Sequence, residues 1–151
     1  MSDLLAPPIE QLRAELEGRE LPAGSFAVPA YEAWLTADAL EAPPLPDGTL
    51  HPMYVWYAAV RGVGYDIAYL FDLVGCAPED GPMLGETEIE QLRPMRVAER
   101  YDVTSSILDL ARKQGSSGTF DLMRVRVDVH TTDGERVGGV LNTYVYPRRP
   151  R

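Results

Sequence analysis

Two histidines are the side chains in this sequence best suited to acid–base chemistry. His51 follows a proline-rich loop and comes just before an apolar segment with helical spacing. At a helix start, a neutral imidazole could bind water or a polarised oxygen; the alternative is that His51 caps the helix or packs at its mouth. His130 alternates with Arg124, Arg126 and Asp128 along a β-rich run, which predicts a solvent-facing position on a sheet.

Asp66 lies in the middle of the same apolar segment, beside Tyr65 and Tyr69. A buried carboxylate must find hydrogen bonds or become protonated. Asp66 is therefore a candidate general base or water-orienting group, with Tyr65 beside it. The alternative places Asp66 on a partly exposed helix face, or in an ion pair with Arg61 across a dimer.

The acidic residues do not predict a metal site. Glu86, Glu88 and Glu90 alternate along a predicted strand and so share one solvated face. They have no histidine companion, and Cys76 is the only cysteine, so no site with two thiolates can form within the chain. We expect neither a metal nor a resident cofactor. Nucleophile-elbow, phosphate-loop and zinc patterns are absent from the sequence.

The composition favours one cytoplasmic domain. The chain has 151 residues, 45% of them hydrophobic, and a formal net charge of -9. Such a charge would repel a phosphate backbone, so nucleic acid is an unexpected partner. The N-terminus lacks the pattern of a signal peptide, and no apolar stretch is long enough to cross a membrane. We expect Arg148 to Arg151 to form a solvated basic tail.

The segment from Pro52 to Gly75 predicts one long buried helix. It has few polar positions, with proline at its start and glycine at its end. A helix of about 24 residues would be about 36 Å long. Gly62 and Gly64 inside it predict the close approach of another backbone or a break in the helix.

Four stretches after residue 82 have the alternating pattern of strands. They are Met83–Leu92, Tyr101–Arg112, Thr119–Thr132 and Arg136–Tyr146. We expect a four-strand antiparallel meander with a tight turn at Asp133-Gly134. The alternation slips near residues 107–108 and 123–124, which predicts bulges that bend the sheet.

Three further elements are expected before the central helix. Pro8 to Gly18 has the spacing of a short helix, and Ser25 to Pro29 that of a short strand. Ala30 to Leu40 predicts a helical turn or two. Its large apolar side chains would point inward; these are Tyr31, Trp34 and Leu35.

From about His51 to Pro147 the sequence resembles the MaoC-like hydratase and dehydratase group of hot-dog proteins. The matching pieces are His51-Pro52-Met53, Met83-Leu84-Gly85-Glu86, Leu92-Arg93-Pro94-Met95-Arg96-Val97, Asp133-Gly134-Glu135-Arg136-Val137 and Thr143-Tyr144-Val145-Tyr146-Pro147. The resemblance implies an α+β hot-dog fold, an antiparallel sheet wrapped around a long central helix. It divides residues 1–151 into an N-terminal region (1–46), a core (47–147) and the tail (148–151).

The resemblance also implies a function. Members of this group add or remove water across the double bond of an acyl thioester carried on coenzyme A or phosphopantetheine, and an Asp-x-x-x-x-His segment before the central helix activates the water. A backbone N–H at the helix start holds the thioester oxygen. In this chain Pro52 has no N–H, so Met53 or a neighbour would have to donate.

The catalytic pair of the group has no counterpart here, because Ala30 to Pro46 contains no histidine. The first hypothesis is a hydro-lyase with a nonstandard site made of His51, Asp66 and Tyr65. The substrate-binding residues would be Met53, Tyr54, Trp56, Tyr57, Arg61 and Gly85. The aromatic side chains among them would either pack in the core or form a wall around a large or cyclic acyl group.

Other functions remain open on the same resemblance. The chain would be the non-catalytic half of a heterodimeric dehydratase, as in the mycobacterial two-subunit enzymes, if a partner supplies the Asp and His. A thioesterase using Asp66, or a tailoring enzyme acting on a carrier protein, are further alternatives. Long strands leave an unpaired edge, so we expect a homodimer or a heterodimer with a second hot-dog protein.

Overall fold

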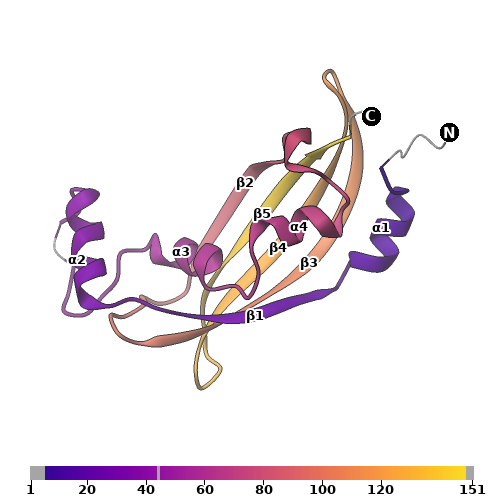
Figure 1. Cartoon of the computed structure of the whole chain (residues 1–151). Helices are drawn as coiled ribbons and strands as arrows, with labels where there is room; N and C mark the ends of the chain where they lie inside the picture. Colours follow the sequence, from indigo (N-terminus) through magenta and orange to yellow (C-terminus); the bar gives the residue numbers. More distant parts are fainter. Residues whose placement is uncertain (1–5, 44, 149–151) are drawn as a thin grey trace.

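The computed structural model describes residues 6–43 and 45–148, which form an antiparallel sheet with helices packed on one of its faces (Figure 1). The helices are α1 (Ile9–Leu16), α2 (Ala30–Ala39), α3 (Tyr54–Arg61) and α4 (Ile67–Leu73), with a short 3-10 helix η1 (Pro78–Asp80). The strands are β1 (Glu20–Ala27), β2 (Met83–Gln91), β3 (Arg100–Gly115), β4 (Gly118–Thr131) and β5 (Arg136–Pro147). This arrangement confirms the predicted α+β class and all four predicted strands.

The strand order is β1-β3-β4-β5-β2, and every neighbouring pair is antiparallel. The expected four-strand meander was wrong in one respect, because β2 pairs with β5 at the far edge and not with β3. Tight connections place β4 between β3 and β5, so both edges of β4 are occupied. β2 therefore pairs with the remaining edge of β5, and β1 pairs with that of β3.

Strand β3 contains one of the two predicted bulges. The register of the β3–β4 pair shifts between Ile107 and Asp109, opposite Val125 and Arg124. The extra residue, Leu108, turns the following side chains to the other face and bends the strand. The bulge predicted near residues 107–108 is therefore confirmed, whereas the one predicted near residues 123–124 was wrong, because the buried positions of β4 alternate without a break from Asp121 to Thr131.

The turn at Asp133-Gly134 is longer than predicted. The N–H of Thr131 donates to the carbonyl of Glu135 at 2.9 Å, so three residues, 132–134, lie between the two paired ones. Only Gly134 has a positive φ there, at 94°. A two-residue primed turn would need positive φ at both central positions or at the first, so that detail of the prediction was wrong.

The expected single long helix is two short helices, α3 and α4, with a break at residues 62–66. Strand β1 passes directly over this break. A Cβ atom on Gly24 would lie 2.1 Å from the carbonyl oxygen of Gly62, and one on Gly64 would lie 2.3 Å from that of Ala23. The N–H of Gly64 also donates to the carbonyl of Pro22 at 3.1 Å. The glycines thus mark both a close approach and a break.

Gly24→Ala is expected to destabilise the protein strongly. The added methyl group would overlap the backbone at Gly62, and neither segment can move without disturbing the sheet. Overpacking of this kind costs about 1–3 kcal/mol or more. Urea unfolding should show the loss, whereas Ala27→Ser, at an exposed position of the same strand, should leave the unfolding midpoint nearly unchanged. Equal midpoints for both variants would contradict the close contact.

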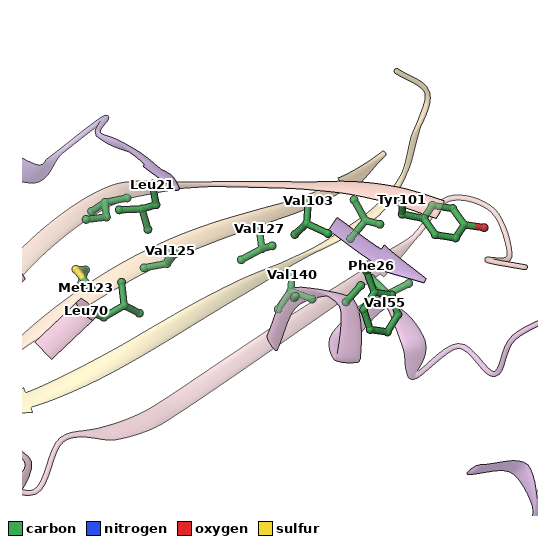
Figure 2. Close-up of a cluster of buried hydrophobic side chains, with 14 of the residues drawn as sticks. Leu21, Phe26, Val55, Leu70, Tyr101, Val103, Met123, Val125, Val127 and Val140 are labelled. Atoms are coloured by element: carbon green, nitrogen blue, oxygen red, sulfur yellow. The ribbon is translucent and has the colours of Figure 1, made fainter. Parts of the chain in front are cut away.

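The core lies between the helices and the concave face of the sheet. Figure 2 shows valines from β3, β4 and β5 pointing toward Val55 of α3 and Leu70 of α4. Alternate residues of β4, including Val125, Val127 and Val129, are buried, and His130 lies on the opposite, partly exposed face. The predicted position of His130 is therefore confirmed.

The two N-terminal helices lie at opposite ends of the molecule (Figure 1). Leu12 and Leu16 of α1 are buried, as its apolar stripe predicted. The inward orientation predicted for α2 was wrong: Tyr31, Trp34 and Leu35 are 68%, 66% and 52% exposed. α2 turns its other face toward α3, where its polar side chains find partners.

Tyr101 on β3 predicts a loss of stability at alkaline pH. Its buried hydroxyl accepts from the N–H of Arg96 at 2.8 Å and donates to Glu99 at 2.6 Å. Burial raises the pKa of Tyr101 to about 12. Because the unfolded chain releases this proton near pH 10 and the folded chain keeps it, stability should be constant below pH 10 and fall between about pH 10 and 12.

Urea titrations from pH 8 to 11.5 would measure this effect, and Tyr101→Phe should reduce the slope. Tyr31→Phe, which removes an exposed hydroxyl, serves as the matched control and should leave the slope as it is. A slope insensitive to Tyr101→Phe would contradict the prediction.

The predicted solvated tail was wrong for Arg148. Its side chain is only 6% exposed, and its Nε lies 2.7 Å from the fully buried carboxylate of Asp121. Arg148 also donates to the carbonyl of Val74 at 2.8 Å, so it belongs to the folded core. Residues 149–151 lie outside the described part of the chain, as do residues 1–5, on which the expectation of no signal peptide rested. No helix in the described ranges is both long enough and apolar enough to span a membrane.

Candidate functional site

His51 lies in the turn that leads into α3, two residues before its N-cap residue Met53. Its Nδ1 accepts a hydrogen bond from the N–H of Met53 at 3.2 Å, and its carbonyl accepts from the N–H of Tyr54 at 2.9 Å. A neutral imidazole that accepts at Nδ1 carries its proton on Nε2. In this state Nε2 can donate a hydrogen bond but cannot take a proton from water. The N–H of Met53, the expected donor for a thioester oxygen, is engaged by the same contact.

Asp66 caps the start of α4, so its expected position in the middle of a continuous helix was wrong. Its Oδ1 accepts from the N–H of Tyr69 at 3.0 Å, and the residue is exposed. The break in the helix explains the difference, because an aspartate is a favoured residue before a first helical turn. Arg61, the partner suggested for Asp66, instead pairs with Glu32 of α2 at 2.5 Å within the chain.

The structure does not bring the three predicted catalytic residues together. His51 and Asp66 lie at opposite ends of α3, whose eight residues span about 12 Å. Tyr65 is next to Asp66, but its hydroxyl lies near Ser105 of β3, on the core side. Burial raises the pKa of Tyr65, which keeps it protonated. No two of these groups contact one another in a way that would activate a water molecule.

Most of the predicted substrate-binding residues hold helices in place. Tyr54 is fully buried, and its hydroxyl lies 2.8 Å from Oγ1 of Thr36 on α2. Arg61 binds Glu32 and lies 5.6 Å from the centre of the Phe26 ring. The contacts of Tyr54 and Arg61 with α2 attach this helix to α3, and the contact with Phe26 joins α3 to β1.

The aromatic pair and the glycine of the predicted site have structural contacts as well. Trp56 and Tyr57 are half-buried and pack edge to face with ring centres 5.5 Å apart. Gly85 lies at an irregularity of β2, where a Cβ atom would come 2.9 Å from Val145. These residues shape the helix and the sheet edge, and their role in substrate binding remains a prediction.

An open groove of about 370 Å³ runs between α3, α4 and the sheet. Its walls are mainly apolar and include Val60, Val63 and Ile67. Val127 of β4 and Tyr144 of β5 line it from the sheet side. Tyr65 and Asp66 lie at the groove as predicted candidates, but sequence reasoning missed Tyr144. Its alternation with Asn142 and Tyr146 along β5 was the only signal that these side chains share one face.

Polar side chains continue from the groove across the concave face of the sheet. The hydroxyl of Thr87 on β2 donates to Oδ1 of Asn142 at 2.9 Å, and Nδ2 of Asn142 donates to the hydroxyl oxygen of Tyr144 at 3.5 Å. Burial raises the pKa of Tyr144 to about 12. The groove is therefore apolar along its helical wall and carries neutral hydroxyl groups on its sheet side.

Among the described residues, no three His, Cys, Asp or Glu side chains are grouped so that they could hold a metal ion. The hydroxyls and aliphatic side chains of the groove are likewise poor ligands for a transition metal. The groove is suited to binding an apolar group that also makes a few hydrogen bonds.

Comparison with known proteins identifies the fold. No protein-family model matches the sequence, and no curated protein matches it. Among solved structures, a chain of the ChsH1-ChsH2 complex from Mycobacterium tuberculosis is similar, with a TM-score of 0.68 and 14% identity over 95% of this chain and 90% of that chain. A chain of the C-terminally truncated HadBC (3R-hydroxyacyl-ACP dehydratase) complex from the same organism has a TM-score of 0.65 and 15% identity, covering 86% of this chain and 96% of that one.

A MaoC-like dehydratase from Rhodospirillum rubrum is also similar, with a TM-score of 0.55 and 19% identity over 89% of this chain and 94% of that chain. The predicted hot-dog fold is thereby confirmed, with MaoC-like dehydratases among the structural neighbours. At these identities the likeness concerns the fold.

Proposed function

We propose that this chain is the acyl-binding, non-catalytic subunit of a heterodimeric hot-dog hydratase or dehydratase that acts on acyl thioesters. One observation carries the proposal: the two predicted acid–base side chains, His51 and Asp66, already accept backbone hydrogen bonds next to helix starts. The segment before α3 that corresponds to the Asp-x-x-x-x-His of the enzymes it resembles, residues 30–46, contains no histidine.

The groove between α3, α4 and the sheet supports a role in binding the acyl group. Its walls of Val60, Val63 and Ile67 suit a hydrocarbon chain, whose burial contributes about 0.8 kcal/mol for each methylene group. The carrier would be coenzyme A or phosphopantetheine. Its thioester would lie against the catalytic residues of the partner.

The edge strand β2 supports the expectation of a partner. It pairs only with β5, and eight of its nine residues are exposed. Met83, Leu84 and Ile89 are 56%, 46% and 44% exposed, and Leu92 just beyond the strand is 56% exposed. A strand edge with this much apolar surface is stabilised by pairing with another strand. The structural neighbours include chains of two-component complexes, which is consistent with a heterodimer.

Reconstitution tests the proposal. The lone chain should hydrate crotonyl-coenzyme A no faster than buffer, because no base is placed near a bound β-carbon. Adding a hot-dog protein with an intact Asp-x-x-x-x-His, encoded by a neighbouring gene, should produce turnover, followed by loss of the enoyl-thioester absorbance. Light scattering should show a 1:1 complex. Robust turnover by the lone chain would overturn the proposal.

The second candidate is a hydro-lyase with a nonstandard site, and one observation favours it. His51 is only half-buried, and the described residues give its Nε2 no hydrogen-bond partner. This nitrogen could donate to a thioester oxygen near the start of α3. The lone chain would then be active, and His51→Ala would lower its turnover by about 100-fold, whereas His130→Ala would change it little.

A further inference from the structure

The hydrogen bonds on the concave face of the sheet run in one direction and end at the groove. Thr87 donates to the amide oxygen of Asn142, and the amide nitrogen of Asn142 donates to the hydroxyl oxygen of Tyr144. The oxygen of Tyr144 is thus an acceptor, so its own proton must be donated elsewhere. Among the described residues no acceptor receives it, and Tyr144 lines the groove.

A pair of hydroxyl groups, those of Tyr65 and Ser105, lies close to Tyr144. Tyr65, on the loop between α3 and α4, also lines the groove, and its hydroxyl lies near that of Ser105 on β3. Ser105 is 7% exposed, and its Oγ has no hydrogen-bond partner of good geometry in the described structure. Polar atoms that are buried without a partner cost about 1–3 kcal/mol each. Ser105 does not line the groove, so the hydrogen-bond donor without a partner at its apolar wall is the hydroxyl of Tyr144.

The protonation states of the tyrosines determine what they can recognise. Burial raises the pKa of Tyr144 to about 12 and also raises that of Tyr65. Both remain neutral at physiological pH, so Tyr144 acts as a hydrogen-bond donor and not as a negative charge. An uncharged oxygen acceptor in an otherwise apolar ligand satisfies this arrangement, because a carboxylate or phosphate would be desolvated without a cation in the groove.

We infer that the groove selects acyl groups that carry a keto or hydroxyl oxygen remote from the thioester, bound by the hydroxyl of Tyr144 with Tyr65 beside it. This inference rests on the proposed function, since it names the substrate class of the same groove. A purely aliphatic acyl chain would enter the groove and leave the proton of Tyr144 unpaired. The competing occupant is an ordered water molecule, which would satisfy the hydroxyls equally well with any acyl group.

Calorimetry with matched ligands tests the inference. The probes are decanoyl-coenzyme A and its isomers with one keto group at successive positions along the chain, titrated into the full-length protein and into its complex with the catalytic partner. One keto isomer should bind about tenfold more tightly than decanoyl-coenzyme A, as expected for one additional hydrogen bond. Tyr144→Phe should remove that preference, because the phenyl ring offers no donor to the keto isomer and leaves no unpaired donor beside decanoyl-coenzyme A. An unchanged urea unfolding curve would show that the variant is folded.

Tyr65→Phe provides a second variant and should reduce the preference, whereas Tyr31→Phe on the exposed face of α2 should not. Equal affinity for all isomers would overturn the inference and leave the proposed function intact. A preference that survives Tyr144→Phe would likewise overturn it, because recognition would lie elsewhere. Failure of every acyl-coenzyme A to bind, alone and in the complex, would overturn both.

Discussion

In a reconstituted complex, replacing the catalytic histidine of the partner is expected to lower turnover by about 100-fold or more, while His51→Ala in this chain should change it little. General acid–base catalysis by a positioned side chain contributes about 10²–10⁴-fold. The Nδ1 of His51 already accepts from the N–H of Met53. Its replacement should therefore weaken the start of α3 without removing a proton-transfer group.

Separate measurement of kcat and KM distinguishes the role of His51 from that of the partner's histidine. His51→Ala would alter the position of α3 and so raise KM, whereas loss of the partner's histidine would lower kcat. His130→Ala is the matched control, because this residue lies on the opposite face of the sheet from the groove. A large fall in kcat for His51→Ala alone would favour the nonstandard active site.

Asp121→Ala is expected to destabilise the fold by about 3–5 kcal/mol, because it leaves the buried Arg148 and the half-buried Arg112 without their anion. Asp121 is fully buried and binds Nε of both Arg112 and Arg148 at 2.7 Å. Arg112 also donates to the carbonyl of Pro7 at 2.9 Å, and Arg148 to that of Val74 at 2.8 Å. One carboxylate thus connects the N-terminal segment, the end of α4 and the last strand.

The control for Asp121 is Asp109→Ala, which also breaks an aspartate–arginine pair between β3 and β4. Asp109 and Arg124 are 41% and 46% exposed, so their pair should contribute less than about 1 kcal/mol. Thermal and urea unfolding of both variants should show the difference clearly. Similar losses for the two variants would mean that the buried network adds nothing to stability beyond a surface ion pair.

Local patterns in the sequence were sufficient to predict most elements. Alternation of period two identified β3 to β5, because a strand that buries one face must alternate apolar and polar residues. The same pattern identified β2, although eight of its nine residues are exposed in this chain. The slip in the alternation near residues 107–108 located the bulge after Ile107, since an inserted residue reverses which face follows. Gly62 and Gly64 predicted where another backbone approaches the helical segment closely, because only glycine leaves room for such an approach.

Contacts between distant segments decided the rest. Whether those glycines break the helix depended on β1 crossing them, and the break in turn made Asp66 a helix cap. The placement of β2 beside β5 depended on which sheet edge remained unpaired. The composition of the groove depended on bringing Tyr65 from the loop before α4 next to Tyr144 from β5. Periodicity reports which face of an element is buried, but it carries no information about which other element covers that face.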